Sequence, residues 1–243
     1  MSAEPRFPSS PDLIARMRTS IRREWRVLVG LLLVALAVWA FVELAGEVRD
    51  GSTKALDRAI LLALRDAADP QRMAGPPWLQ EVMRDFTGLG GNGVLTLITV
   101  GVAGFLVLDG KRQDAGLLLL AVISGLIISH ALKFGFARSR PDLVPHGAPV
   151  FTSSFPSSHS MMSAVVYLTI AAMLARLRPG ARHKIYMLSV AVLLTLVVGA
   201  SRVYLGVHWP TDVLAGWVVG SGWALICWYA TLLLQARGKM PPT

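Results

Sequence analysis

Polar and titratable residues gather in three short stretches of the sequence, each next to a long apolar run. The stretches are "KFGFARSRP" at 133–141, "PSSH" at 156–159 and "SRVYLGVHWPTD" at 201–212. Cations, hydroxyl groups and the unpaired N–H groups at the start of a helix favour a compact oxyanion with several acceptor oxygens, and phosphate fits best. The sequence therefore predicts a phosphate site assembled from segments that lie far apart in the chain.

Three basic side chains and a serine are the candidate phosphate ligands. Arg140 and Arg202 can each present a planar fork to two oxygens, and Lys133 adds a point charge. Ser157 is well placed as the N-cap of the apolar helix that follows, whose N-terminal dipole end also attracts an anion. We expect these four residues to surround one bound phosphate.

Two histidines and an aspartate go beyond what anion binding needs. His208 and Asp212 lie four residues apart, and Pro210 marks a helix start between them, so the carboxylate can reach back to the imidazole. A carboxylate that accepts the Nδ1–H bond leaves the Nε2 lone pair free to attack phosphorus. This pattern predicts His208 as a nucleophile that forms a phosphohistidine. His159 would protonate the leaving oxygen and later activate water.

Composition indicates which elements position these residues. Of the 243 residues, 53% are hydrophobic and only 16% are charged, which is more apolar than a soluble domain of this length needs. About 20 apolar residues cross the hydrocarbon layer, so the pattern predicts an all-α, polytopic bundle of six transmembrane helices. The predicted spans are approximately residues 27–46, 91–108, 115–132, 158–175, 185–200 and 213–234.

An amphipathic segment, residues 47–90, separates the first two predicted spans. Leu56, Ile60 and Leu64 recur at helical spacing, which predicts a helix with one apolar face. The charged residues on its other faces are Lys54, Asp57, Arg58, Arg65 and Asp66. The helix either lies on the bilayer surface or caps the bundle, and periodicity alone does not separate these alternatives.

Basic residues predict the orientation in the membrane. With six spans and a cytoplasmic N-terminus, 14 of the 24 Lys and Arg residues fall on the cytoplasmic side, as the positive-inside rule favours. Both termini are then cytoplasmic, and an even number of crossings brings all three polar stretches to the outer face. The first apolar run is longer than an ordinary signal-peptide core, which favours a retained helix. The predicted organisation is a basic arm at 1–26, a membrane domain at 27–234 with its motifs at 133–212, and a tail at 235–243.

Several other partners and sites are disfavoured. The net charge of +9 would suggest nucleic acid in a soluble chain, but these basic residues flank apolar runs, where lipid headgroups account for them. Cys227 is the single cysteine, so neither an internal disulfide nor a cysteine-based metal site can form. Gly216 and Gly220 form a small-residue spacing that predicts helix contact inside the bundle, with a homodimer contact as the alternative.

The three stretches together resemble the signature of the type 2 phosphatidic acid phosphatase family. The matching residues are Lys133, Arg140, Pro141, Pro156, Ser157, Ser158, His159, Ser201, Arg202, His208 and Asp212. The resemblance implies an integral-membrane lipid phosphatase with a six-helix core that needs no metal or other cofactor. It assigns His208 as nucleophile, Asp212 as the group that orients it, and His159 as general acid.

The same resemblance implies that Lys133, Arg140, Ser157 and Arg202 hold phosphate, together with the backbone N–H group of Ser158. The family's commonest motif has glycine where this chain has Ser158. Glycine lets the backbone approach phosphate closely, so the serine either crowds the site or adds a hydroxyl group.

Rival functions are weighed against a lipid phosphatase. A transporter would carry polar groups near the bilayer midplane, and these spans have almost none. A phosphotransferase that passes the phosphoryl group to an alcohol stays open, because it would use the same phosphohistidine. We expect a phosphatase at the outer face of a cell inner membrane, surrounded by membrane lipids. Candidate substrates are undecaprenyl diphosphate, phosphatidate and phosphatidylglycerol phosphate, among which the sequence does not choose.

Overall fold

The computed structural model describes residues 10–146, 148, 152–177 and 180–236; within these ranges the regular elements are all helices joined by loops, with no β-strand. The prediction of an all-α protein is confirmed. The helices of the described ranges are α1 (Ser10–Asp50), α2 (Lys54–Ala63), α3 (Pro77–Gly88), α4 (Asn92–Leu108), α5 (Arg112–Phe136), α6 (Ser158–Leu177), α7 (Ala181–Tyr204) and α8 (Pro210–Ala236). Because α1 begins at Ser10, a helix extends through much of the predicted basic arm.

Five helices in the described part of the chain are long and apolar enough to cross a membrane, namely α1, α5, α6, α7 and α8. α3 and α4 form a sixth candidate only when they are counted together, and they meet at a bend of 48°. α4 alone has 17 residues, about 26 Å of helix, against a hydrocarbon layer of about 30 Å. The six predicted spans therefore correspond to five helices and one bent pair.

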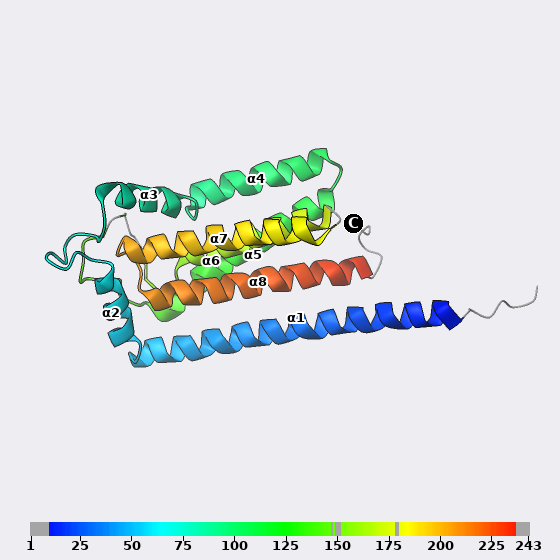
Figure 1. Ribbon diagram of the computed structural model, residues 1–243, viewed down its shortest axis with the longest axis horizontal. Coiled ribbons are helices and arrows are strands. Elements are labelled where there is room, and N and C mark those ends of the chain that lie inside the picture. Colours follow the sequence, from blue (N-terminus) through cyan, green and yellow to red (C-terminus); the bar gives the residue numbers. More distant parts are fainter. Residues whose placement is uncertain (1–9, 147, 149–151, 178–179, 237–243) are drawn as a thin grey trace, which may run out of the picture.

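α6 lies at the centre of the bundle and α1 at its edge. α6 packs against α7 and α8 and also contacts α5 and α4, whereas α1 lies along α8 (Figure 1). In the most apolar part of each helix, 61% of the α6 residues are buried, against 6% of those in α1. The helix that begins with the "PSSH" motif is thus held by protein on most sides, while α1 presents apolar side chains to lipid.

Two glycines allow α6 and α8 to approach each other closely. A Cβ atom at Gly216 would lie 2.6 Å from the carbonyl oxygen of Ser157, and one at Gly220 would lie 2.4 Å from that of Met161. No larger side chain fits at either position without moving the backbone. The predicted role of this spacing in helix contact inside the bundle is therefore confirmed, and it brings the start of α8 against the start of α6.

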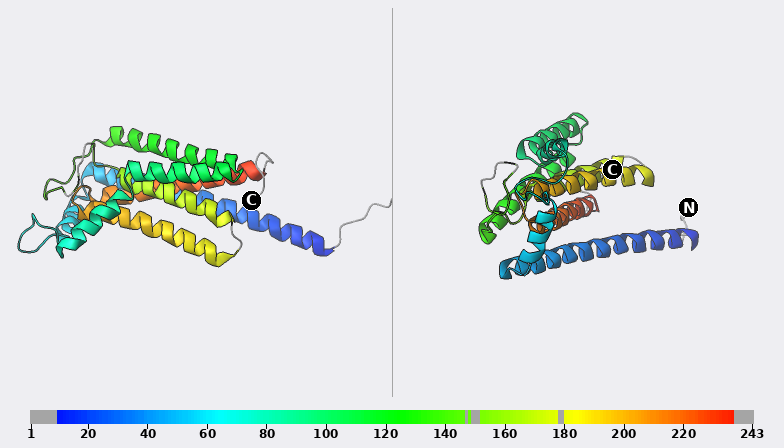
Figure 2. Two further views of the ribbon diagram at one scale, coloured as in Figure 1. Left: turned by 90° about the horizontal axis from the view of Figure 1, so that it is seen from above. Right: turned by 60° about the vertical axis from the view of Figure 1, so that its left-hand side comes forward.

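The bundle has two distinct ends (Figures 1 and 2). α1 starts and α8 ends at one of them, and α2 and α3 lie at the other. This second end also holds the end of α5, the start of α6, the end of α7 and the start of α8. The three polar stretches occupy these helix ends and the segments between them, so the fold gathers them at one end of the bundle.

α2 packs on the bundle as a cap, but through a different face from the apolar one in the sequence. Asp57 and Leu61 are completely buried against α8 and its neighbours, whereas Leu56 is 60% exposed and Ile60 is 39% exposed. Arg65, just beyond the helix, is also buried and donates a hydrogen bond to the carbonyl oxygen of Tyr204 at 2.8 Å. Asp57 and Arg65 are among the charged residues predicted on the other faces, and both are buried because each finds polar partners inside.

Candidate active site

His208 and Asp212 stand at the start of α8, which begins at Pro210. Both side chains are buried, with 1% of His208 and none of Asp212 exposed. The Nδ1 atom of His208 lies 3.4 Å from Asp212 Oδ2, and its Nε2 atom lies 3.2 Å from Arg140 Nη1. The ring thus turns one nitrogen to a carboxylate and the other to a cation, as a nucleophilic Nε2 requires.

The environment keeps the His208 ring neutral. Burial lowers the pKa of His208 to about 3; Asp212 acts in the opposite direction, while the charges of Arg202 and Arg140 lower it further. A guanidinium group can only donate hydrogen bonds, so the neutral ring accepts at Nε2 and carries its proton on Nδ1, toward Asp212. Without a ligand, the Nε2 lone pair therefore points at Arg140.

The carboxylate of Asp212 is fixed from several directions. Its Oδ2 atom accepts hydrogen bonds from the hydroxyl group of Ser154 and from the backbone N–H of Trp209, the latter at 2.9 Å. Its Oδ1 atom accepts a bond from Arg138 Nη1 at 2.7 Å. Both oxygens are engaged and the charge is paired, so Asp212 has little freedom to turn away from the ring.

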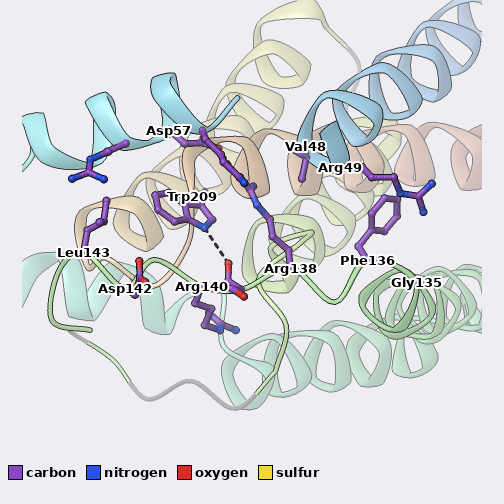
Figure 3. Close-up of a pocket in the computed structure, with 13 residues that line it drawn as sticks. Val48, Arg49, Asp57, Gly135, Phe136, Arg138, Arg140, Asp142, Leu143 and Trp209 are labelled. Atoms are coloured by element: carbon purple, nitrogen blue, oxygen red, sulfur yellow. Dashed lines mark hydrogen bonds and ion pairs between the residues drawn. The ribbon is translucent and has the colours of Figure 1, made fainter. Parts of the chain in front are cut away.

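Arg138 joins Asp212 to a second buried carboxylate. Its Nη2 atom donates to Asp57 Oδ2 at 2.7 Å, and Figure 3 shows the side chain reaching from the segment after α5 toward α2. Asp57 also accepts bonds from the backbone N–H and hydroxyl groups of Thr211, at 3.0 and 2.7 Å. The cap helix α2 is thereby tied to the residue that faces His208.

Sequence reasoning missed these supporting residues. Arg138 was visible within the first polar stretch, two positions before Arg140, but the family signature does not include it. Ser154 and Thr211 have types that occur in many loops and helix caps. Nothing in the sequence marked Asp57, because its burial follows from the docking of α2 rather than from its neighbours in the chain.

Two of the predicted cations donate hydrogen bonds to backbone carbonyl groups. Lys133 Nζ donates to the carbonyl oxygen of Ser153 at 2.6 Å, and Arg140 Nη1 donates to that of Val207 at 2.7 Å. Neither forms an ion pair with a carboxylate in the ranges that the structure describes. Their charges are therefore positioned but not neutralised by the protein.

Arg202 is the most deeply buried of these cations, with 4% of the residue exposed. Its Nη1 atom donates to Thr87 Oγ1 at 2.9 Å, while its Nε–H group is buried without a hydrogen-bond partner among the described residues. Burying an unpaired polar group is costly, and an anion bound beside it would remove that cost. His159 interacts electrostatically with Arg202, Arg140 and Lys133, which places it in the same cluster.

The start of α6 supplies backbone donors. The hydroxyl group of Ser157 accepts bonds from the Ser160 hydroxyl at 3.0 Å and the Ser160 N–H at 3.5 Å, so Ser157 is the predicted N-cap. The hydroxyl group of Ser158 lies 2.9 Å from that of Ser129 on α5. Its side chain is thus turned to the neighbouring helix and does not crowd the site. The N–H groups of Ser158 and His159 have no partner in the described part of the chain.

The eight predicted residues thus lie at one end of the bundle, and seven side chains join this cluster or its N-cap while that of Ser158 faces α5. Among the described residues, no three His, Cys, Asp or Glu side chains are grouped so that they could hold a metal ion. The cluster offers cations, helix-start N–H groups and a neutral imidazole. Chemically, it can bind an oxyanion and attack it.

Comparisons with known proteins match the same region. A family model described as the PAP2 superfamily matches residues 114–235. The chain is 35% identical over 183 residues to phosphatidylglycerophosphatase B of Bacillus subtilis, covering 74% of this chain and 85% of that protein. It is 26% identical over 150 residues to an undecaprenyl-diphosphatase of Sulfolobus acidocaldarius, covering 59% and 66%. The crystal structure of a transmembrane PAP2-type phosphatidylglycerolphosphate phosphatase from Bacillus subtilis matches with a TM-score of 0.76 at 31% identity, over 83% of this chain and 96% of that one.

Proposed function

This chain belongs to the PAP2 superfamily and is a membrane lipid phosphatase, and we propose that it works through a phosphohistidine formed on His208. One observation carries the proposal: His208 Nε2 faces Arg140 at 3.2 Å while Nδ1 faces Asp212 at 3.4 Å. A neutral ring held in this way aims its lone pair at the place where cations without carboxylate partners are gathered. Phosphate bound there would meet the nucleophile directly.

In the proposed first step, the Nε2 lone pair attacks phosphorus and the bond between phosphorus and the lipid oxygen breaks. His159 gives a proton to the departing oxygen. Lys133, Arg140 and Arg202 hold the equatorial oxygens and balance the charge that develops on them, with the Ser158 N–H as a further donor. Because these groups supply the positive charge, the proposed reaction needs no metal ion.

In the proposed second step, a water molecule gives a proton to His159 and attacks the phosphohistidine. The bond between nitrogen and phosphorus breaks, inorganic phosphate leaves, and the His208 ring regains its neutral form. The Nδ1–H bond to Asp212 holds the same tautomer through both steps. An alcohol that replaced this water would receive the phosphoryl group instead.

We propose that the substrate is a lipid phosphate of the kind named for the relatives, such as phosphatidylglycerol phosphate or undecaprenyl diphosphate, with phosphatidate as a third candidate. The reacting groups lie at the end of the bundle opposite to where α1 starts and α8 ends. By the distribution of basic residues, we propose that this end faces the periplasm or cell exterior and that both termini are cytoplasmic. A lipid could then present its phosphate while its tail stays in the bilayer.

The test is phosphate release by purified protein in detergent, with a chelator present, from these three lipids. His208→Ala should lower kcat/KM by roughly 10⁴-fold or more. His130→Ala is the matched control, because His130 is exposed on α5 and bonds only the Leu126 carbonyl oxygen. In the unsubstituted protein, rapid quenching should trap a phosphoenzyme that survives in alkali and is lost in acid. The His208→Ala variant should form no such phosphoenzyme.

A His208→Ala variant that still releases phosphate at a near-normal rate would contradict the proposed nucleophile. Adding a lipid alcohol distinguishes transfer of the phosphoryl group to water from its transfer to an alcohol. Release of inorganic phosphate that is unaffected by the alcohol supports a hydrolase, whereas a phosphorylated alcohol as the main product would identify a phosphotransferase.

A further inference from the structure

A separate cavity lies beside the site, on the α2 side of Arg140 (Figure 3). Its volume is about 540 Å³, and it is enclosed by the last turn of α1, the first turns of α2, the end of α5 and the segment 138–143. Neither His208 nor His159 lines it, so it is not the pocket in which the reaction is proposed. Arg140 lines the cavity and also faces His208, which makes the two spaces neighbours.

Basic side chains dominate the lining of this cavity. The charged residues around it are Arg49, Lys54, Arg58, Arg138 and Arg140, with Asp57 and Asp142 as the acidic ones. Asp57 and Arg138 neutralise each other at 2.7 Å. Lys54 and Arg58 form no side-chain hydrogen bond or ion pair with any residue that the structure describes. The cavity therefore keeps an excess of positive charge that the protein does not balance.

The cavity also lies at the end of a candidate membrane span, where lipid headgroups are expected. Arg49 belongs to the last turn of α1, where the candidate span Val27–Asp50 ends, and its guanidinium lies 6.0 Å from the centre of the Phe136 ring. Val48, Phe136 and Trp209 contribute apolar walls beside the cations. Such a lining suits a headgroup that combines a negative charge with a short carbon chain.

We propose that this cavity binds a second phosphate in the headgroup of the substrate while the terminal phosphate reacts at His208. The inference rests on the proposed function, because it assumes that a lipid phosphate occupies the site next door. It divides the candidate substrates by chemistry. Phosphatidylglycerol phosphate carries a second phosphate one glycerol unit from the reacting one, whereas phosphatidate, with the same tail, carries none.

The test compares these two lipids, with identical acyl chains, in micelles of a neutral detergent. In the double variant Lys54→Ala/Arg58→Ala, KM for phosphatidylglycerol phosphate should rise about tenfold with kcat nearly unchanged, because two cations that would face the second phosphate are lost. KM for phosphatidate should change by less than about twofold. Arg72→Ala is the control, because Arg72 is an exposed cation before α3 that does not line the cavity.

A binding measurement makes the result independent of turnover. In the His208→Ala background, phosphatidylglycerol phosphate should bind about tenfold more tightly than phosphatidate, and the double variant should remove that difference. Equal effects on the two lipids, or no effect on either, would overturn the cavity proposal. So would a defect that appears only when a non-substrate anionic lipid is added, because the cavity would then hold bulk lipid. An unsubstituted protein that hydrolyses no lipid phosphate would instead contradict the proposed function.

Discussion

Each side of the His208 ring has an arginine close by, but only the arginine on the Nδ1 side has carboxylate partners in the described part of the chain. On the Nδ1 side, the buried carboxylates of Asp212 and Asp57 share Arg138, which contacts each at 2.7 Å. On the Nε2 side, Arg140 lies 3.2 Å from the ring and has no carboxylate partner within the described ranges. Lys133 and Arg202, which interact electrostatically with Arg140 and His159, also lack a carboxylate partner there, and these three cations form the unpaired side.

This difference separates scaffold from binding site. A buried network in which every charged group has an ion-pair partner is rigid, and it serves to hold one group in one orientation. Cations without a carboxylate partner in the protein can pair with the negative charge of a bound ligand. Arg202 is the clearest example, because its buried Nε–H group has no hydrogen-bond partner among the described residues. Arg138 and Arg140 stand two positions apart in the chain and fall on opposite sides of this division. Residue type alone therefore does not reveal which arginine binds substrate.

The largest expected effect comes from the unpaired side. Arg202→Ala should lower kcat/KM by about 10²–10³-fold, because one donor to the developing charge is lost. Its thermal unfolding midpoint should not fall, since the change removes a buried cation that has no carboxylate partner. Thr87→Val is the control: it removes the hydrogen-bond partner of Arg202 Nη1 but keeps the charge, so it should cost far less activity. A strongly destabilised Arg202→Ala protein would break the comparison.

The paired side should respond in the reverse manner. Arg138→Met keeps the bulk of the side chain but leaves two buried carboxylates unpaired, which should cost about 3–5 kcal/mol of stability. We expect kcat to fall by about 10–100-fold with KM nearly unchanged, because His208 loses its orienting support rather than a phosphate ligand.

Asp57 on α2 provides a second test of the paired side. In a double-mutant cycle, Asp57→Asn should be less damaging in the Arg138→Met background than alone, because the unpaired charge is already present. Kinetics and chemical denaturation in mixed micelles measure both quantities. Trp223→Phe is a suitable control, since it removes the interhelical bond to the Ala121 carbonyl oxygen away from the site. If Arg138→Met raised KM without lowering stability, Arg138 would instead be assigned to substrate binding.

The unpaired side could be predicted from the sequence, whereas only Asp212 could be predicted on the paired side, through its spacing from His208. Lys133, Arg140, Arg202, His159 and His208 have the residue types and the spacing that phosphate chemistry requires, and the apolar runs between them set which helix ends meet. The pairing of Arg138 joins residues 81 positions apart and depends on how α2 docks.

The apolar residues of α2 did not correctly predict which face of the helix packs on the bundle, for a related reason. Leu56 and Ile60 stay exposed while Asp57 enters the interior, because a buried arginine and a helix start satisfy its carboxylate. Periodicity measures side-chain hydropathy and carries no information about such distant partners. The second predicted span, residues 91–108, coincides with α4, which begins at Asn92; what the sequence did not indicate is that α4 is long enough to count as a span only together with α3.

A neutral ring between these two sides gives a prediction about pH. Burial lowers the pKa of His208 to about 3; the Asp212 carboxylate opposes this shift without cancelling it, and the charges of Arg202 and Arg140 lower the pKa further. Between pH 7 and pH 5 the neutral fraction of an ordinary imidazole falls about 25-fold, whereas that of His208 should hardly change. The difference between ¹⁵N-histidine spectra of the unsubstituted and His208→Ala proteins should contain no signal that titrates in this range. A signal titrating near pH 6.5 would mean that the ring is solvated.

The same shift affects stability with a definite sign. The folded pKa lies below the unfolded value, so the unfolded chain binds a proton at His208 before the folded protein does. His208 therefore leaves stability unchanged above about pH 6.5 and lowers it progressively as the pH falls from there toward about 3. His208→Ala should flatten this acid limb in thermal unfolding midpoints measured across the range. If the unfolding midpoint fell equally steeply with pH in the unsubstituted and His208→Ala proteins, the proton would be taken up by a group other than His208.

The smallest expected effect is at Ser158, where the family's commonest motif has glycine. Its hydroxyl group lies 2.9 Å from that of Ser129, on the side of α6 that faces α5, while its N–H group stays available at the helix start. Ser158→Gly keeps that N–H group and should change kcat/KM by less than about threefold, with a stability loss of about 0.5–1 kcal/mol from the added backbone freedom. Ser129→Ala removes the same hydroxyl pair from α5 and should match it in activity. A tenfold change in Ser158→Gly alone would mean that the serine side chain takes part on the phosphate side, and the boundary between scaffold and binding site would have to be moved to include it.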